Sequence, residues 1–81
     1  MNGKKVVIAG AGVMGASLAQ VYSLAGYETV VYDIFEHALE KGKHLISINQ
    51  EMMVRERLIT KTESEQAYGR IAFTMEKTCF L

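Results

Sequence analysis

The sequence predicts an α/β fold with a parallel sheet, and three observations carry this prediction. Residues 4–9 and 28–33 contain short β-branched apolar runs without polar alternation, which is typical of strands covered on both faces. A helical pattern separates the two runs, and a glycine-rich turn joins the first run to that helix. This order indicates the start of a doubly wound sheet, whose first three strands lie in the order 3-2-1.

The first part of the chain reads as a βαβ unit over residues 5–33. After the first strand, a helix is expected from Val13 to about Ala25, and Gly26 would end it in the left-handed conformation. The large apolar residues of this helix alternate with small ones: Val13, Leu18, Val21 and Leu24, with Ala16, Ser17 and Ala19 between them. The second strand ends at an acid, Asp33.

A long helical segment is predicted over about residues 35–69. Its first helix is expected to reach about Ile59, because apolar residues at seven-residue spacing form one stripe: Ala38, Leu45, Met52 and Ile59, with Leu39, Ile46, Met53 and Ile48 beside them. Gly42 weakens this helix by roughly 1 kcal/mol relative to alanine and is a candidate position for a bend.

A second, short helix and a third strand complete the predicted elements. A capping box starts the helix, and two frames satisfy its pattern equally: Thr62 with Glu65, or Thr60 with Glu63. The helix would end near Gly69, and the third strand would cover about residues 70–74. No linker or repeat divides the chain, so residues 1–81 are expected to form one domain.

Composition restricts the classes of partner. Nine basic residues balance nine acidic ones, which argues against nucleic acid or an anionic membrane as the main partner. Cys79 is the only cysteine, so neither an intrachain disulfide nor a cysteine metal site is expected, and a reducing, cytoplasmic setting fits best. The apolar run at 6–9 is too short for a membrane span, and no signal peptide is recognised.

The turn at residues 10–15 has the pattern G-x-G-x-x-G directly after a strand and at the start of a helix. Gly10 would permit the tight turn, Gly12 would let the backbone approach a pyrophosphate, and Gly15 would let the helix pack closely. The N–H groups at the helix N-terminus, with about half a positive charge, would face that pyrophosphate. A ligand-free glycine turn is the alternative, but the surrounding pattern of strand, helix, strand and acid favours a nucleotide site.

Asp33 lies at the end of the predicted second strand, at the position of the acid that binds the adenosine ribose hydroxyls. Its carboxylate would repel a 2′-phosphate, and no lysine or arginine follows before Lys41, so NAD is preferred over NADP. FAD, whose acid is more often glutamate, is the minor alternative. No metal site is predicted, because His37 and His44 have no third ligand.

The motif string Val7–Gly15, continued by Leu18-Ala19-Gln20 and by Ala25–Asp33, resembles the N-terminal region of the L-3-hydroxyacyl-CoA dehydrogenases, 3-hydroxybutyryl-CoA type. The resemblance covers residues 4 to about 75. It implies that the turn Gly10, Ala11, Gly12, Val13, Met14 and Gly15, together with Asp33, binds NAD. The 3-hydroxyisobutyrate and 6-phosphogluconate dehydrogenases share the G-x-G-x-M-G turn and are the second choice, although they lack the long helical segment.

The resemblance also implies hydride transfer between NAD and a 3-hydroxyacyl-CoA, in fatty acid or butanoate metabolism, for a full-length protein. The family's catalytic residues lie downstream of the third strand, so the 81 residues are expected to be the N-terminal half of a Rossmann sheet, truncated and inactive. The family's two CoA-contacting positions hold Asn49 and Glu56 here, and that role is not carried over. A stand-alone nucleotide-binding or regulatory module is the alternative. Because one sheet face and one edge would stay bare, self-association is expected.

Overall fold

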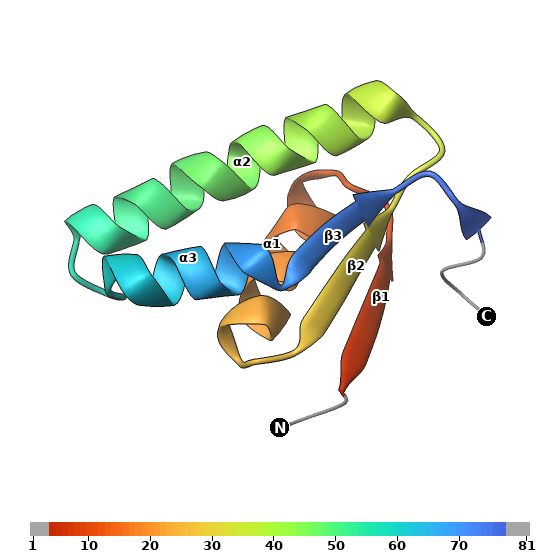
Figure 1. The fold of residues 1–81 in the computed structure, drawn as a ribbon. Coiled ribbons are helices and arrows are strands. Elements are labelled where there is room, and N and C mark those ends of the chain that lie inside the picture. Colours follow the sequence, from red (N-terminus) through yellow and green to blue (C-terminus); the bar gives the residue numbers. More distant parts are fainter. Residues whose placement is uncertain (1–3, 78–81) are drawn as a thin grey trace.

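The computed structural model describes residues 4–77 as a three-stranded parallel sheet with three helices (Figure 1). In chain order the elements are β1 (Lys5–Ala9), α1 (Val13–Leu24), β2 (Glu28–Tyr32), α2 (Glu36–Arg55), α3 (Lys61–Gly69) and β3 (Ile71–Thr74). The strand order is β1-β2-β3, which read from the other edge is 3-2-1. Val7 pairs with Val30, and Val30 pairs with Ala72, so β2 is the central strand.

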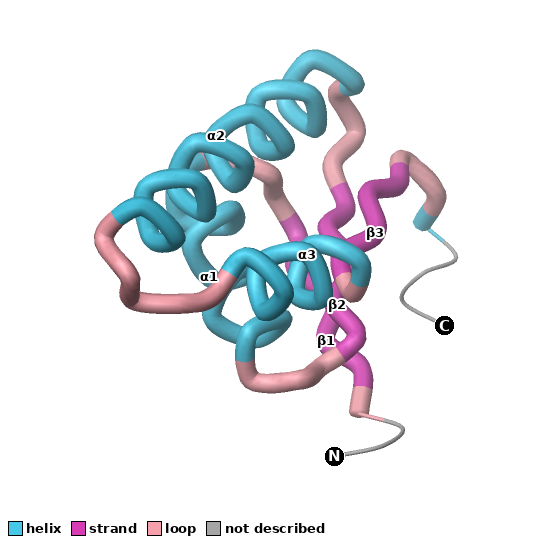
Figure 2. Tube along the Cα trace, turned by 60° about the vertical axis from the view of Figure 1, so that its left-hand side comes forward, coloured by secondary structure: helices cyan, strands magenta, loops and turns pink. Residues whose placement is uncertain are grey.

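All three helices lie on one face of the sheet (Figures 1 and 2). The core between the layers is built from alternate strand residues and from helix residues that face them: Ile8, Val31 and Ile71 from the strands, with Ala16, Ala19, Leu39 and Ile46 from the helices. Because strand side chains alternate, Val7, Val30 and Ala72 point to the opposite face. No element within residues 4–77 covers that face.

Helix α1 packs on the sheet through its small residues rather than its large ones. Ala16, Ala19 and Ser23 are buried, whereas Val13 and Val21 are 70% and 62% exposed. Small side chains let the helix axis approach the strands closely, and the bulky residues are thereby left on the outer side. The predicted end is confirmed: Gly26 has φ +100° and its N–H donates to the Ser23 carbonyl at 3.1 Å.

Helix α2 ends at Arg55, four residues before the expected end at Ile59. The end is a Schellman motif with Arg57 in the left-handed position, at φ 62°. The N–H of Leu58 donates to the Met53 carbonyl at 2.9 Å, and that of Arg57 to the Val54 carbonyl at 3.0 Å. Gly42 lies within this continuous helix, and Figure 1 shows α2 as straight, so the candidate bend at Gly42 is not formed.

Helix α3 settles which of the two capping frames is used. Thr60 is the N-cap: its hydroxyl accepts from the Glu63 N–H at 3.0 Å, and the Glu63 carboxylate accepts from the Thr60 N–H at 2.8 Å. Thr62 therefore lies inside the helix, and the Thr62 frame is wrong. β3 follows at Ile71, one residue later than predicted. Cys79 lies outside the described residues.

None of the helices in the described part of the chain is both long and apolar enough to cross a membrane.

Candidate functional site

The candidate site is the turn at the carboxyl end of β1. Gly10 adopts φ +103°, a conformation that side chains disfavour, and its N–H donates to the Tyr32 carbonyl at 2.7 Å. Gly12 is the N-cap of α1, and a Cβ built there would meet no atom within 4 Å. A Cβ on Gly15 would instead overlap the Gly10 carbonyl oxygen. Gly10 and Gly15 shape the turn, while Gly12 leaves open space in front of it.

The N-terminus of α1 opens on this space without a side-chain cap. Gly12 provides no capping side chain, and the first turn of the helix contains no acid. Its unneutralised positive end therefore favours an anion, as at other helix N-termini that bind phosphate. The side chains of Val13 and Met14 are strongly exposed beside it.

Asp33 stands directly after β2, next to the turn. Its Oδ1 accepts from the Phe35 N–H and its Oδ2 from the Ala11 N–H, each at 3.0 Å. Both hydrogen bonds lower the pKa of Asp33 below its ordinary value, and the bond from Phe35 has the larger effect. The Asp33 side chain is therefore a carboxylate at neutral pH. A carboxylate offers about four acceptor positions, which leaves capacity for two hydroxyl donors.

The structure brings the seven sequence-predicted residues, 10–15 and Asp33, together at the carboxyl ends of β1 and β2. Ala11 differs from the others because it is only 1% exposed, and its N–H is taken by Asp33. Sequence reasoning missed two contributors: the Phe35 N–H, whose role depends on loop geometry, and Gly42, which lies against Ala11. His37 and His44 are exposed, and residues 4–77 contain no cluster of potential metal ligands.

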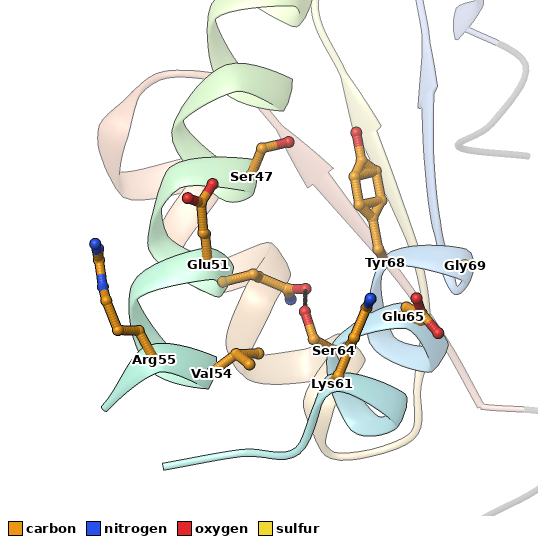
Figure 3. A pocket seen from close by; sticks show the side chains of 10 residues that line it. Ser47, Glu51, Val54, Arg55, Lys61, Ser64, Glu65, Tyr68 and Gly69 are labelled. Carbon is orange, nitrogen blue, oxygen red and sulfur yellow. Dashed lines mark hydrogen bonds between the residues drawn. The ribbon is translucent and has the colours of Figure 1, made fainter. Parts of the chain in front are cut away.

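A groove with a volume of about 730 Å³ lies elsewhere, between α2 and α3 (Figure 3). Inside it Ser64 donates to Gln50 Oε1 at 2.6 Å. Within residues 4–77, Gln50 Nε2 has no hydrogen-bond partner, but it is shielded from solvent and so offers nothing to a ligand in the groove. The glycine turn, with an open helix N-terminus and an ionised acid, is the better candidate site.

A parallel βαβ unit with this turn and this acid defines a dinucleotide-binding protein of the Rossmann class. A sequence model described as "3-hydroxyacyl-CoA dehydrogenase, NAD binding domain" matches residues 5–80. The chain therefore belongs to the 3-hydroxyacyl-CoA dehydrogenase family and corresponds to its NAD-binding domain, with NAD as the cofactor.

Individual relatives agree with the family assignment. The chain is 35% identical over 68 residues to a 3-hydroxybutyryl-CoA dehydrogenase of Bradyrhizobium diazoefficiens, covering 84% of this chain and 23% of that protein. The solved (S)-3-hydroxybutyryl-CoA dehydrogenase of Ralstonia eutropha matches with a TM-score of 0.86 and 27% identity, over 90% of this chain and 26% of that one. The Escherichia coli 3-hydroxybutyryl-CoA dehydrogenase matches with a TM-score of 0.91 and 25% identity, over 99% and 17%. The chain thus spans between 17% and 26% of the length of these three relatives.

Proposed function

We propose that residues 10–15 hold the pyrophosphate of NAD at the N-terminus of α1, and that Asp33 holds the adenosine ribose. The observation that carries this proposal is the open space at Gly12 in front of an uncapped helix N-terminus. The backbone N–H groups there bind and orient the pyrophosphate, and Gly12 has no side chain that could obstruct it. Asp33 accepts hydrogen bonds from the ribose hydroxyls on the acceptor positions that Ala11 and Phe35 leave free.

The same geometry favours NAD over NADP and FAD. Asp33 is ionised, and a 2′-phosphate on the ribose would bring negative charge against it. The two residues that follow Asp33 in the chain, Ile34 and Phe35, are both exposed and apolar, so neither of them supplies a cation to compensate.

For a full-length protein that contains this domain, we propose hydride transfer between NAD and an (S)-3-hydroxyacyl-CoA, as part of fatty acid or butanoate metabolism in the cytoplasm. Support comes from the relatives, which are named for 3-hydroxybutyryl-CoA. NAD supplies the hydride chemistry, and these 81 residues position it. On this proposal an acyl-CoA binds only in the full-length protein, and the 81 residues alone do not turn it over.

Replacing Gly12 with alanine tests the cofactor site. The added methyl group meets no protein atom within 4 Å but enters the space assigned to the pyrophosphate. We therefore expect the melting temperature to stay unchanged and NAD affinity to fall about 10- to 100-fold, the equivalent of about one charged hydrogen bond. Calorimetric titrations with NAD, NADP and FAD measure this. Equal NAD affinity in the variant, or tighter binding of NADP or FAD by the unmodified chain, would contradict the proposal.

We also propose that the isolated chain self-associates through the face that carries Val7 and Val30 and through the outer edge of β1. Within residues 4–77 no strand pairs with that edge, and the chain's net charge of zero provides no repulsion between copies. Sedimentation velocity is expected to show dimers or larger species that Val30→Lys dissociates. A stable, cooperatively folded monomer at high concentration would disprove this.

A further inference from the structure

Helix α2 passes directly against the glycine turn at Gly42. Gly42 is buried, and a Cβ built on it would lie 2.8 Å from the Ala11 carbonyl oxygen and 3.3 Å from the Ala11 Cβ. The first of these distances is too short for real atoms, so one of the two backbones would have to move. The absence of a side chain at Gly42 therefore lets α2 and the turn touch.

The backbone of Ala11 is held at both its N–H and its carbonyl group. Its N–H donates to Asp33 Oδ2 at 3.0 Å, while its carbonyl oxygen faces Gly42. The Ala11 carbonyl and the Gly12 N–H belong to one planar peptide group. A displacement of the oxygen by a few tenths of an ångström consequently tilts the N–H of Gly12, the N-cap residue of α1.

We propose that Gly42 is a positioning residue of the NAD site: it sets the orientation of the Ala11–Gly12 peptide, and any side chain at this position lowers NAD affinity. This inference rests on the proposed function of the turn. Gly42 itself does not touch the cofactor. Glycine is a poor helix former, and alanine the best, so helix propensity alone favours alanine at this position. The close approach to Ala11 is the opposing requirement.

Gly42→Ala and Gly69→Ala form a matched pair for the test. Gly69 is the last residue of α3, and a Cβ there would meet nothing within 4 Å. Both variants add one methyl group to a helical glycine. We expect Gly42→Ala to weaken NAD binding about tenfold, the loss of one well-aligned hydrogen bond, and Gly69→Ala to leave it unchanged. Titrations are run well below both melting temperatures, so that a change in stability alone leaves the measured affinity unaltered.

A second readout separates this inference from the proposed function. In ¹H–¹⁵N spectra without ligand, the Gly12 amide resonance is expected to shift in Gly42→Ala and to stay in place in Gly69→Ala. If the unmodified chain fails to bind NAD, the proposed function fails, but the shift still reports on the contact between Gly42 and the turn. An unshifted Gly12 amide together with NAD affinity within twofold of the unmodified chain would overturn the inference.

Should Gly42→Ala not fold, the double variant Ala11→Gly/Gly42→Ala replaces it. The double variant removes the Ala11 Cβ and frees residue 11 to move its carbonyl away. We then expect a folded chain with a displaced Gly12 amide and weakened NAD binding. Unchanged affinity in the double variant would overturn the inference as well.

Discussion

Replacing Gly15 with alanine is expected to destabilise the chain more than any other single methyl addition in the turn, by at least about 3 kcal/mol. The new Cβ would overlap the Gly10 carbonyl oxygen and lie 3.6 Å from Ile8 Cγ2. The turn cannot recede, because the Gly10 N–H is bonded to Tyr32 at 2.7 Å. The helix cannot recede either, because Ala16 and Ala19 are packed on the sheet.

Urea or thermal denaturation followed by circular dichroism measures this effect. Domains have only about 0.05–0.15 kcal/mol of stability per residue, so a loss of this size removes a substantial part of the total free energy of unfolding. Gly12→Ala is the matched control, since it adds the same methyl group three residues earlier into open space. Equal denaturation midpoints for the two variants would show that the packing around Gly15 is looser than described.

Replacing Asp33 with alanine is expected to have the largest effect on cofactor affinity, about a 100-fold loss for NAD. The substitution removes the proposed acceptor of the ribose hydroxyls and also frees the Ala11 N–H, which the carboxylate holds at 3.0 Å. Discrimination against NADP should shrink, because the negative charge that opposes a 2′-phosphate is gone. Calorimetric titration of both nucleotides gives the two affinities.

The control for this substitution is Glu36→Ala. Glu36 is an exposed acid in the first turn of α2, three residues along the chain, so it reports the effect of removing a nearby charge without removing the hydrogen bonds. NAD affinity should be nearly unchanged in this variant. Equal losses in both variants would mean that Asp33 acts through general electrostatics and not as a ribose ligand.

The pH dependence of stability gives an independent check on Asp33. Its pKa is lowered from 3.8 in the folded chain, first by the Phe35 N–H and then by the Ala11 N–H. A group with a lowered folded pKa stabilises the fold above its ordinary pKa, and this contribution fades as the pH falls through the lower folded value. The unmodified chain should therefore lose its stability advantage over Asp33→Ala below about pH 4. A constant difference down to pH 2 would contradict the assigned hydrogen bonds.

Local sequence patterns were sufficient to predict the parallel βαβ unit. The β-branched runs, the glycine pattern and the acid at the end of the second strand each follow from backbone sterics and side-chain periodicity, and the structure places them as expected. Gly26 ended α1 as predicted, because a left-handed residue there favours glycine. The family assignment rested on the same residues and is confirmed.

The end of α2 was not visible in the sequence. Arg57 occupies the left-handed position that glycine usually takes, and no residue type there signals a helix end. Because the apolar stripe continues to Ile59, periodicity alone placed the predicted end of the helix four residues beyond its observed end at Arg55. The choice between Thr60 and Thr62 as N-cap depended on this end, since it fixes how much chain remains for the loop before α3.

The sequence by itself determined the order of the elements, the glycine turn with its acid, and through them the cofactor, because these features depend on residues close together in the chain. Only the tertiary structure decided which side of α1 is buried and what Gly42 does. Both depend on how closely two backbones approach, which is set by packing between distant segments. Small residues of α1 face the sheet. Gly42, which by helix propensity only weakens α2, is the residue at which α2 contacts the turn.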